Sequence, residues 1–231
     1  QAIAAAEAGK HLVIEKPVAL SRGELHRVQQ AVSKAGVLSS VCFELHWIVS
    51  CRNTRALVDR GELGAVFYAE AAYNHGIKRD NAQFAWGHQT RQAGGSAFLT
   101  AGCHALDAVI HLLGRRVTEV AAYATTTPSN AEGYEYPPNA IAMLRFEGGA
   151  IGKASVSLES ENPYHFPVVV QGSKGTVVDN RYYTANLPAA TGWVTIPCDV
   201  PESGDVKDHP YKGQFQHLAD CVRTGRPAEN D

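Results

Sequence analysis

The chain has 231 residues, of which 45% are hydrophobic and 19% charged, and its formal net charge is −2. This length suits one large domain, or one domain with part of a second. Without a basic excess, and without a run of the ~18 apolar residues that a membrane helix needs, we expect neither a nucleic-acid nor a membrane partner. The five cysteines are odd in number, scattered and free of CxxC pairs, which favours reduced thiols in a cytoplasmic protein over a disulfide framework or a zinc site.

The first 45 residues alternate between helical and strand patterns. The expected elements are a helix at 2–8, a strand at 11–14, a helix at 22–35 and a strand at 37–43. Ser21 and Glu24 form a capping-box pattern at the start of the second helix. The order helix, strand, helix, strand predicts that residues 1–45 are the C-terminal remnant of a doubly wound α/β domain.

Beyond residue 45 the pattern changes to one of many strands. A helix at 50–60, a strand at 65–73 and a polar segment at 74–93 precede a central helix. Strands are expected after it at 118–126, 140–147, 150–159, 166–171, 175–180 and 192–196, and a last helix at 210–224. The prediction for residues 46–231 is an α+β domain with one open, mostly antiparallel sheet and its helices on one face.

The central helix is expected over residues 94–114, with Ser96 as its N-cap and Gly114 as its stop. It is apolar or small at almost every position, which predicts burial on most sides. Its three polar exceptions are His104, Asp107 and His111. They lie on nearly one stripe of the helix, and buried polar groups must be satisfied because an unpaired one costs ~2–7 kcal/mol. We therefore interpret this helix as one wall of a site.

His104 is the candidate catalyst on that wall, because histidine titrates near neutral pH. The alternative is a hydrogen-bonded core histidine. Asp107 is assigned a supporting role, with a capping or salt-bridge role as the alternative, and His111 a structural one. Since the two histidines lie ~10 Å apart along the axis, we exclude a shared metal site on this helix. Gly102 predicts close approach of another backbone or of a flat ligand.

Two further groups of residues are candidates. Lys16 follows a buried strand and precedes Pro17, and the carboxyl ends of parallel strands are where α/β sheets bind ligands. The alternative for Lys16 is an ordinary surface ion pair with Glu15. The polar segment 74–93 is either a solvated loop or a substrate-contacting one. Its candidate residues are Trp86, His88 and Arg91.

Four motifs then occur in order along nearly the whole chain. They are GKHLVIEKP at 9–17, GELG at 61–64, GG at 94–95 followed by Gly102-x-His104-x-x-Asp107, and GSKGT at 172–176. On these motifs the chain resembles the Gfo/Idh/MocA oxidoreductases, a family named for glucose–fructose oxidoreductase and inositol dehydrogenase.

The resemblance implies an N-terminal Rossmann domain that binds NAD or NADP. It also implies that the open-sheet domain, 46–231, holds the substrate and forms a homodimer or homotetramer. Glu15, Lys16 and Pro17 would be cofactor-binding residues, with Lys16 also near the substrate and the Lys16–Pro17 bond often cis in relatives. His104 would transfer the proton of a substrate hydroxyl, and Asp107 would support the site. Family substrates are mostly sugars, cyclitols and polyols.

The sequence departs from the family pattern at several points. Thr100 occupies the position, four residues before the histidine, where the family helix commonly carries an acid, and His46 stands where an arginine is frequent. The chain contains neither GxGxxG nor GxxxxGK[ST]. We expect a fragment that lacks most of the nucleotide-binding half, and that binds NAD weakly or not at all.

The combined interpretation is the substrate-binding part of an NAD(P)-dependent oxidoreductase. It would transfer hydride between a sugar or polyol hydroxyl and the nicotinamide, with His104 as general base and Lys16 polarising the reacting oxygen. Two alternatives stay open at this point. One is a glycosidase of the same family that uses the nicotinamide transiently, and the other is a non-catalytic oligomeric binding module.

Overall fold

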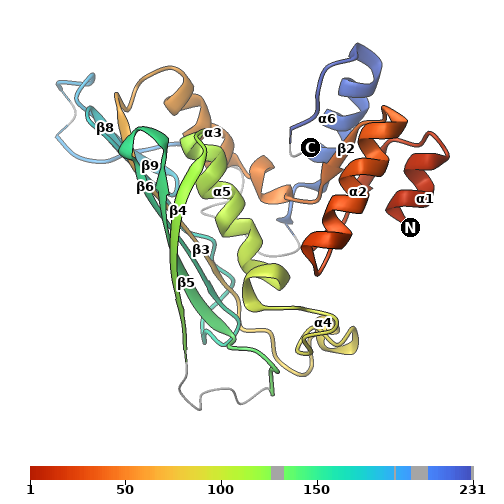
Figure 1. The fold of residues 1–231 in the computed structure, drawn as a ribbon. Coiled ribbons are helices and arrows are strands. Elements are labelled where there is room, and N and C mark those ends of the chain that lie inside the picture. Colours follow the sequence, from red (N-terminus) through yellow and green to blue (C-terminus); the bar gives the residue numbers. More distant parts are fainter. Residues whose placement is uncertain (126–132, 190, 199–207, 230–231) are drawn as a thin grey trace. The chain divides into compact units, whose positions relative to one another are not determined.

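The computed structural model describes residues 1–125, 133–189, 191–198 and 208–229. The chain forms two compact units, one made of Gln1–Trp47 with Pro210–Asp231 and the other of Ile48–His209. The last helix therefore groups with the first residues of the chain and not with the open sheet (Figure 1). The roles expected for 1–45 and 46–231 stay predictions.

The first unit has the expected order of elements. It contains α1 (Ala2–Glu7), β1 (Leu12–Ile14), α2 (Arg22–Ala35), β2 (Ser39–Val41), the 3-10 turn η1 (Glu44–Trp47) and α6 (Tyr211–Thr224). The two strands are parallel, with Val13 opposite Ser40. The side chain of Ser21 accepts a hydrogen bond from the Glu24 amide at 3.3 Å, which confirms the N-cap of α2.

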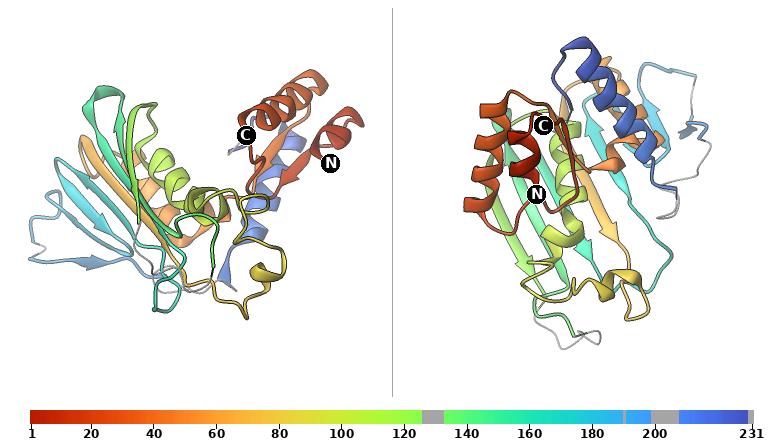
Figure 2. Two further views of the ribbon diagram at one scale, coloured as in Figure 1. Left: turned by 60° about the horizontal axis from the view of Figure 1, so that its bottom comes forward. Right: turned by 90° about the vertical axis from the view of Figure 1, so that its right-hand side faces the viewer.

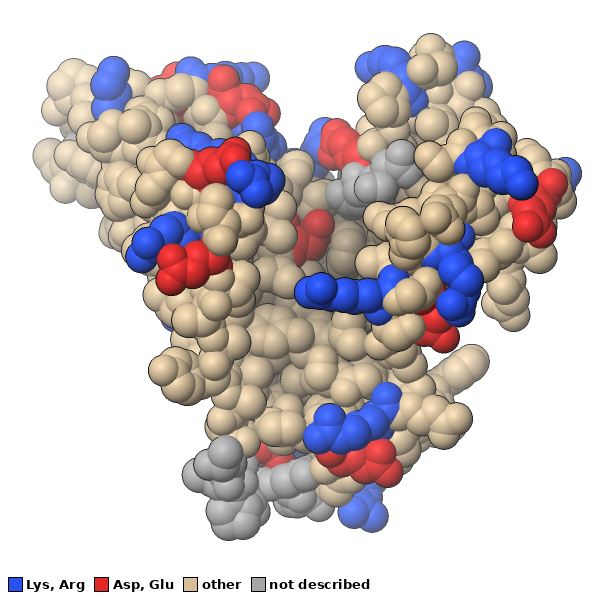
Figure 3. Space-filling model, in the orientation of Figure 1, with Lys and Arg blue, Asp and Glu red and all other residues tan. Residues whose placement is uncertain are grey.

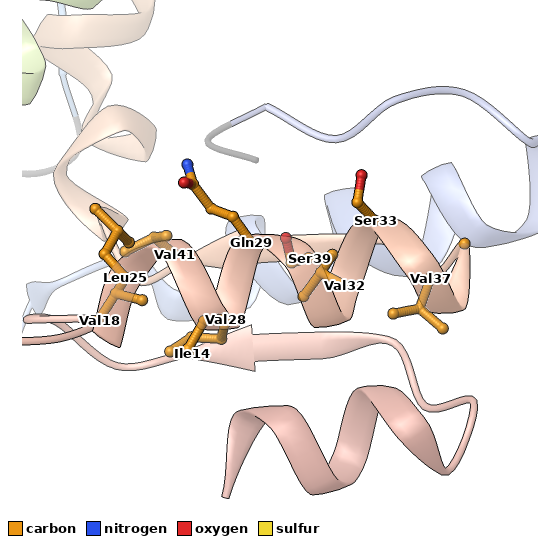
Figure 4. A pocket seen from close by; sticks show the side chains of 11 residues that line it. Ile14, Val18, Leu25, Val28, Gln29, Val32, Ser33, Val37, Ser39 and Val41 are labelled. Carbon is orange, nitrogen blue, oxygen red and sulfur yellow. The ribbon is translucent and has the colours of Figure 1, made fainter. Parts of the chain in front are cut away.

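Helix α2 presents an apolar side to the strands of this unit. A groove of about 550 Å³ lies along it (Figure 4). Its lining residues are Ile14, Val18, Leu25, Val28, Gln29, Val32, Ser33, Gly36, Val37, Ser39 and Val41. Because none of these side chains is ionisable, the groove lacks groups for acid–base chemistry.

The second unit is built on an eight-stranded sheet. Its helical elements are α3 (Val49–Asp59), α4 (Ala82–Ala85), the π-helical turn η2 (Phe98–Gly102), α5 (Cys103–Leu113) and the short 3-10 turn η3 (Glu147–Gly149). Its strands are β3 (Val66–Asn74), β4 (Val117–Ala124), β5 (Asn139–Phe146), β6 (Ile151–Ser157), β7 (Val168–Gly172), β8 (Gly175–Val178), β9 (Arg181–Thr184) and β10 (Val194–Thr195).

The strand order is β10-β9-β8-β7-β3-β6-β5-β4. Within the described sheet β3 and β6 pair in parallel, and the other neighbours are antiparallel. Helices α3 and α5 lie on one face of this sheet (Figures 1 and 2). The prediction of an open, mostly antiparallel sheet with helices on one face is confirmed.

Alternate residues of the central strands form the core under α5. The buried strand residues of this face include Ala69, Ala71, Tyr73, Ala154, Val156, Leu144 and Phe146. The helix contributes Ala105, Ala108, Val109 and Leu112, all of them buried. Buried residues recur at every second position along the strands and at every third or fourth position along the helix, as expected for elements that are buried on one side.

The boundaries differ from the sequence prediction in a few places. The expected strand at 37–43 is only Ser39–Val41, β9 was not expected, and residue 126 of the expected strand 118–126 lies outside the described residues. The central helix starts as expected, because the Ser96 hydroxyl accepts a hydrogen bond from the Leu99 amide at 3.2 Å. Its first part, however, is a π-helical turn rather than regular α-helix.

Two of the glycine motifs pack against each other. The turn at 61–64 follows α3, and the turn at 172–175 joins β7 to β8. The Ser173 hydroxyl accepts a hydrogen bond from the Ala65 amide at 3.0 Å, and the Lys174 amide donates to the Leu63 carbonyl at 2.9 Å. A side chain at Gly64 would overlap Ser173. Gly64 therefore serves the mutual packing of the two turns.

Candidate functional site

His104 lies in the first turn of α5 and is 2% exposed. Its ring stacks on that of Tyr73, with centroids 5.8 Å apart and planes inclined by 17°. The π-helical turn η2 ends one residue before α5 begins, and such turns are frequent at functional sites. The structure thus places the candidate catalyst where the helix geometry changes, against the central strand β3.

Around Tyr73 the structure gathers four further rings that sequence reasoning missed. Tyr73 contacts His75, Tyr164 and Phe166 at ring-centroid distances of 6.1, 5.6 and 6.5 Å. Tyr164 also contacts His209, at 5.4 Å. The alternation of β3 could have placed Tyr73 and His75 on the helix-covered face. For Tyr164 and His209, which come from distant segments, the sequence carried no comparable signal.

Thr100 does not present a free hydroxyl to this cluster. Its Oγ1 donates to the Gly94 carbonyl at 2.9 Å and lies 3.1 Å from the Tyr136 hydroxyl. Tyr136 in turn donates to the His88 carbonyl at 2.6 Å, and burial raises the pKa of this tyrosine. Thr100 therefore fixes the chain segment that leads into the helix.

Gly102 lies close to two side chains. A Cβ there would lie 2.7 Å from the Phe98 ring and 2.9 Å from the Val156 Cβ. The nearest neighbours of such a Cβ are side chains, one of them on β6, while the approach of another backbone or of a flat ligand stays a prediction. The glycine lets the π-helical turn lie directly on the sheet.

Asp107 and the backbone of His111 interact with residues of helix α3. Burial, with Asp107 and then Asp179, raises the pKa of the Cys51 thiol to about 12. The His111 carbonyl accepts a hydrogen bond from Arg55 Nη1 at 2.7 Å. The hydrogen bond from Arg55 to the His111 carbonyl helps to hold α3 against α5. The supporting role of Asp107 at the site stays a prediction.

The three candidates of the polar segment are spread along a loop. Trp86 is 77% exposed. The Arg91 amide donates to Glu135 Oε2 at 2.8 Å, while its side chain is exposed. His88 is half-buried and is joined to Tyr136 through its carbonyl. Contact of these side chains with a substrate stays a prediction.

Lys16 belongs to the other unit, where it follows β1. The Lys16–Pro17 peptide bond is cis. Close to Lys16, the Cys42 thiol hydrogen-bonds to Glu15. Burial, together with the charges of Glu15 and Glu44, raises the pKa of this thiol to about 12, and the charge of Lys16 lowers it by a smaller amount. A polar cluster thus stands at the carboxyl ends of β1 and β2. The pairing of Lys16 with His104 stays a prediction.

Other classes of site receive no support from the described residues. Among them, no group of three or more His, Cys, Asp or Glu side chains could hold a metal ion. No helix in the described ranges is both long and apolar enough to cross a membrane. On the face shown in Figure 3, acidic and basic side chains are interspersed.

Two family models match this chain. Residues 1–43 match the oxidoreductase family with an NAD-binding Rossmann fold. Residues 51–178, more than half of the chain, match the GFO/IDH/MocA C-terminal domain. The chain belongs to the Gfo/Idh/MocA oxidoreductase family. The resemblance drawn from its four motifs is confirmed.

Similar Gfo/Idh/MocA proteins include sugar and polyol dehydrogenases. The scyllo-inositol 2-dehydrogenase (NAD(+)) of Bacillus subtilis is 27% identical over 228 residues, which cover 97% of this chain and 64% of that protein. The levoglucosan dehydrogenase of Pseudarthrobacter phenanthrenivorans is 26% identical over 201 residues, covering 78% and 51%. The chain thus spans less than two thirds of the length of these relatives.

Solved structures of this family share the fold. A levoglucosan dehydrogenase in complex with NADH and levoglucosan superimposes with a TM-score of 0.86 and 20% identity, covering all of this chain and 69% of that one. An NAD-binding oxidoreductase from Klebsiella pneumoniae gives 0.74 at 26% identity, covering 84% and 56%.

Within the Gfo/Idh/MocA frame, both departures concern buried residues. Thr100 is 2% exposed and hydrogen-bonded as described above. His46 is 3% exposed and lies in η1, its ring centroid 6.0 Å from that of Trp47. Thr100 carries a hydroxyl instead of the family's common carboxylate, and His46 an imidazole instead of the frequent guanidinium.

Proposed function

We propose that this chain is the substrate-binding part of an NAD(P)-dependent dehydrogenase that oxidises a hydroxyl of a sugar or polyol. The observation that carries the proposal is the buried His104 imidazole at the start of α5, in a chain of the Gfo/Idh/MocA family. The dehydrogenases of inositol and levoglucosan among its relatives support this substrate class.

His104 is proposed as the general base. Oxidation of a secondary alcohol removes a proton from oxygen and a hydride from carbon, and leaves a carbonyl. When bound, the nicotinamide accepts the hydride. The imidazole takes the proton, because histidine is the side chain that most often acts as a general base. Lys16 would polarise the reacting oxygen, because an ammonium favours the negative charge that develops on it.

The residues at the carboxyl ends of β1 and β2 fit only part of a dinucleotide. Glu15, Lys16 and Pro17 stand where α/β sheets bind ligands, and the neighbouring Cys42 stays a neutral thiol. The chain carries no glycine-rich turn for the pyrophosphate. The relatives are longer than this chain, and we propose that a nucleotide-binding half corresponding to their additional residues would hold most of the cofactor, NAD or NADP. This chain alone would bind the cofactor weakly or not at all.

The glycosidase alternative is not favoured, because the relatives named above are dehydrogenases. The module alternative differs from our proposal in one respect, namely that no chemistry occurs at His104. Five free cysteines accord with the proposed cytoplasmic location.

We also propose that the open face of the sheet forms a homodimer or homotetramer. Tyr123, Met143 and Ile151 on this side are 79%, 43% and 44% exposed. Nearer the centre, the Tyr68 hydroxyl donates to Glu70 Oε2 at 2.6 Å, and Glu70 pairs with Lys153. Several large apolar side chains exposed on one face are typical of a protein–protein interface. Light scattering on the chain tests this, because a monomer at micromolar concentration would contradict it.

The experiment for the activity uses the full-length protein that contains this chain. It would be incubated with NAD or NADP and a panel of inositols, aldoses and anhydrosugars, while absorbance at 340 nm and released sugars are followed. We expect stoichiometric reduced cofactor and ketone. Sugar release without net reduced cofactor would favour the glycosidase, and a stable oligomer without turnover would favour the module.

A further inference from the structure

A general base works only when its ring is held in one orientation, since small misplacements cost large factors in rate. His104 is therefore expected to have a neighbour that fixes its plane. The His104 ring stacks on the Tyr73 ring, with centroids 5.8 Å apart and planes inclined by 17°. This contact joins the start of α5 to the end of β3.

Thr100 lies one turn before His104, and its hydrogen bonds support a different part of the site. Its hydroxyl is directed to the Gly94 carbonyl and the Tyr136 hydroxyl. Both contacts belong to the entry segment of the helix, which Tyr136 links further to the His88 carbonyl. These hydrogen bonds of Thr100 thus hold the chain segment that enters the helix.

Tyr73 is itself held from several directions. It is 3% exposed, and its hydroxyl lies 3.5 Å from His75 Nδ1. Tyr164 and Phe166 meet its ring edge-on, with planes inclined by 74° and 73°. Edge-to-face contacts of this kind are favourable aromatic geometries. An aromatic ring that is fixed in this way can hold the plane of a ring that stacks on it.

We propose that Tyr73 is the positioning residue of His104, and that its aromatic ring, rather than its hydroxyl, does the positioning. His75, Tyr164 and Phe166 hold that ring in place. The inference rests on the proposed function only in its kinetic consequence, because the stack is a property of this chain alone.

The first test measures the stack without any turnover. In the chain labelled with ¹³C-histidine, a parallel tyrosine ring shifts the His104 ring protons upfield, and His104→Gln assigns the signal. We expect the shift to persist in Tyr73→Phe and to vanish in Tyr73→Leu. Phe146→Leu, which removes another fully buried ring of the same sheet, is the control and should leave the signal in place. If Tyr73→Leu does not fold, Tyr73→Met supplies an unbranched apolar side chain without an aromatic face.

The second test is kinetic and uses the full-length protein. Tyr73→Leu should lower kcat about tenfold or more while KM changes less than about twofold, and Tyr73→Phe should restore most of the loss. An unchanged kcat in Tyr73→Leu, or an equal loss in Tyr73→Phe, would overturn the proposal. Should the full-length protein show no dehydrogenase activity, the proposed function fails, while the upfield shift still decides whether Tyr73 fixes His104.

Discussion

The hydroxyl of Thr100 donates a hydrogen bond to the carbonyl of Gly94, 2.9 Å away, across the turn by which the chain enters its central helix. The same hydroxyl touches Tyr136, whose own hydroxyl donates to the His88 carbonyl. At a position where the family commonly has an acid, Thr100 therefore links the π-helical turn to two loop segments.

Thr100→Val should destabilise the chain by about 1–3 kcal/mol, because it leaves buried polar partners without their hydrogen bond. Thr100→Asp should cost at least as much, since a carboxylate would face the Gly94 carbonyl in a buried site. Urea unfolding followed by circular dichroism measures both. A Thr100→Asp chain as stable as the wild type would show that the position still accepts the acid.

Gly102→Ala should destabilise by about 1–3 kcal/mol, although alanine is the better helix former by ~1 kcal/mol. The added Cβ would meet Phe98 and Val156 at under 3 Å. Gly23 in α2 is the matched control, because a Cβ there has nothing within 4 Å, and Gly23→Ala should be neutral or stabilising. Equal effects of the two substitutions in urea unfolding would contradict the packing argument.

Gly64→Ala should destabilise more than Gly61→Ala. Both glycines have a left-handed backbone, with φ of 70° and 71°, so both substitutions carry a similar conformational cost of about 1–3 kcal/mol. Only at Gly64 would the new Cβ also overlap Ser173, whereas Gly61 faces open space. The difference between the two unfolding free energies isolates the packing of the two turns, and a difference of zero would refute it.

Stability should fall as pH rises from 9 towards 12, in part because of Cys51. Its pKa is raised from 9.0 to about 12 by burial and by Asp107 and Asp179. Between these values the unfolded chain loses a proton that the folded chain keeps, so the unfolded state is favoured as pH increases. In Cys51→Ala the decline should be shallower by up to about 1.4 kcal/mol per pH unit. Urea unfolding between pH 8.5 and 10.5 compares the slopes, and parallel slopes would contradict the assignment.

Local signals in the sequence were sufficient for much of the fold. The capping pattern of Ser21 with Glu24 gave the start of α2, and Gly114 gave the end of α5, where φ is 60°. These features depend on residues within one turn of each other. The polar stripe likewise singled out His104, because a buried imidazole on an apolar helix is visible from periodicity alone.

What could not be predicted depends on contacts between distant segments. The π-helical turn at 98–102 arises where Gly102 lies on Val156, and no local pattern announces that contact. The sequence predicts Tyr73 only as a strand residue, because its stack on His104 joins β3 to α5, which are distant in the chain. The parallel pairing of β3 with β6 is equally non-local. Tertiary packing, rather than local propensity, decided these features.

The central claim is that His104 is the general base of a hydroxyl-oxidising enzyme. The most direct test is the chemical step of His104→Ala in the full-length protein, measured by the pre-steady-state rate of cofactor reduction. The account predicts a fall of about 10²-fold or more. His111→Ala, seven residues along the same helix, should stay within about twofold of the wild type. An unchanged rate for His104→Ala would contradict the claim.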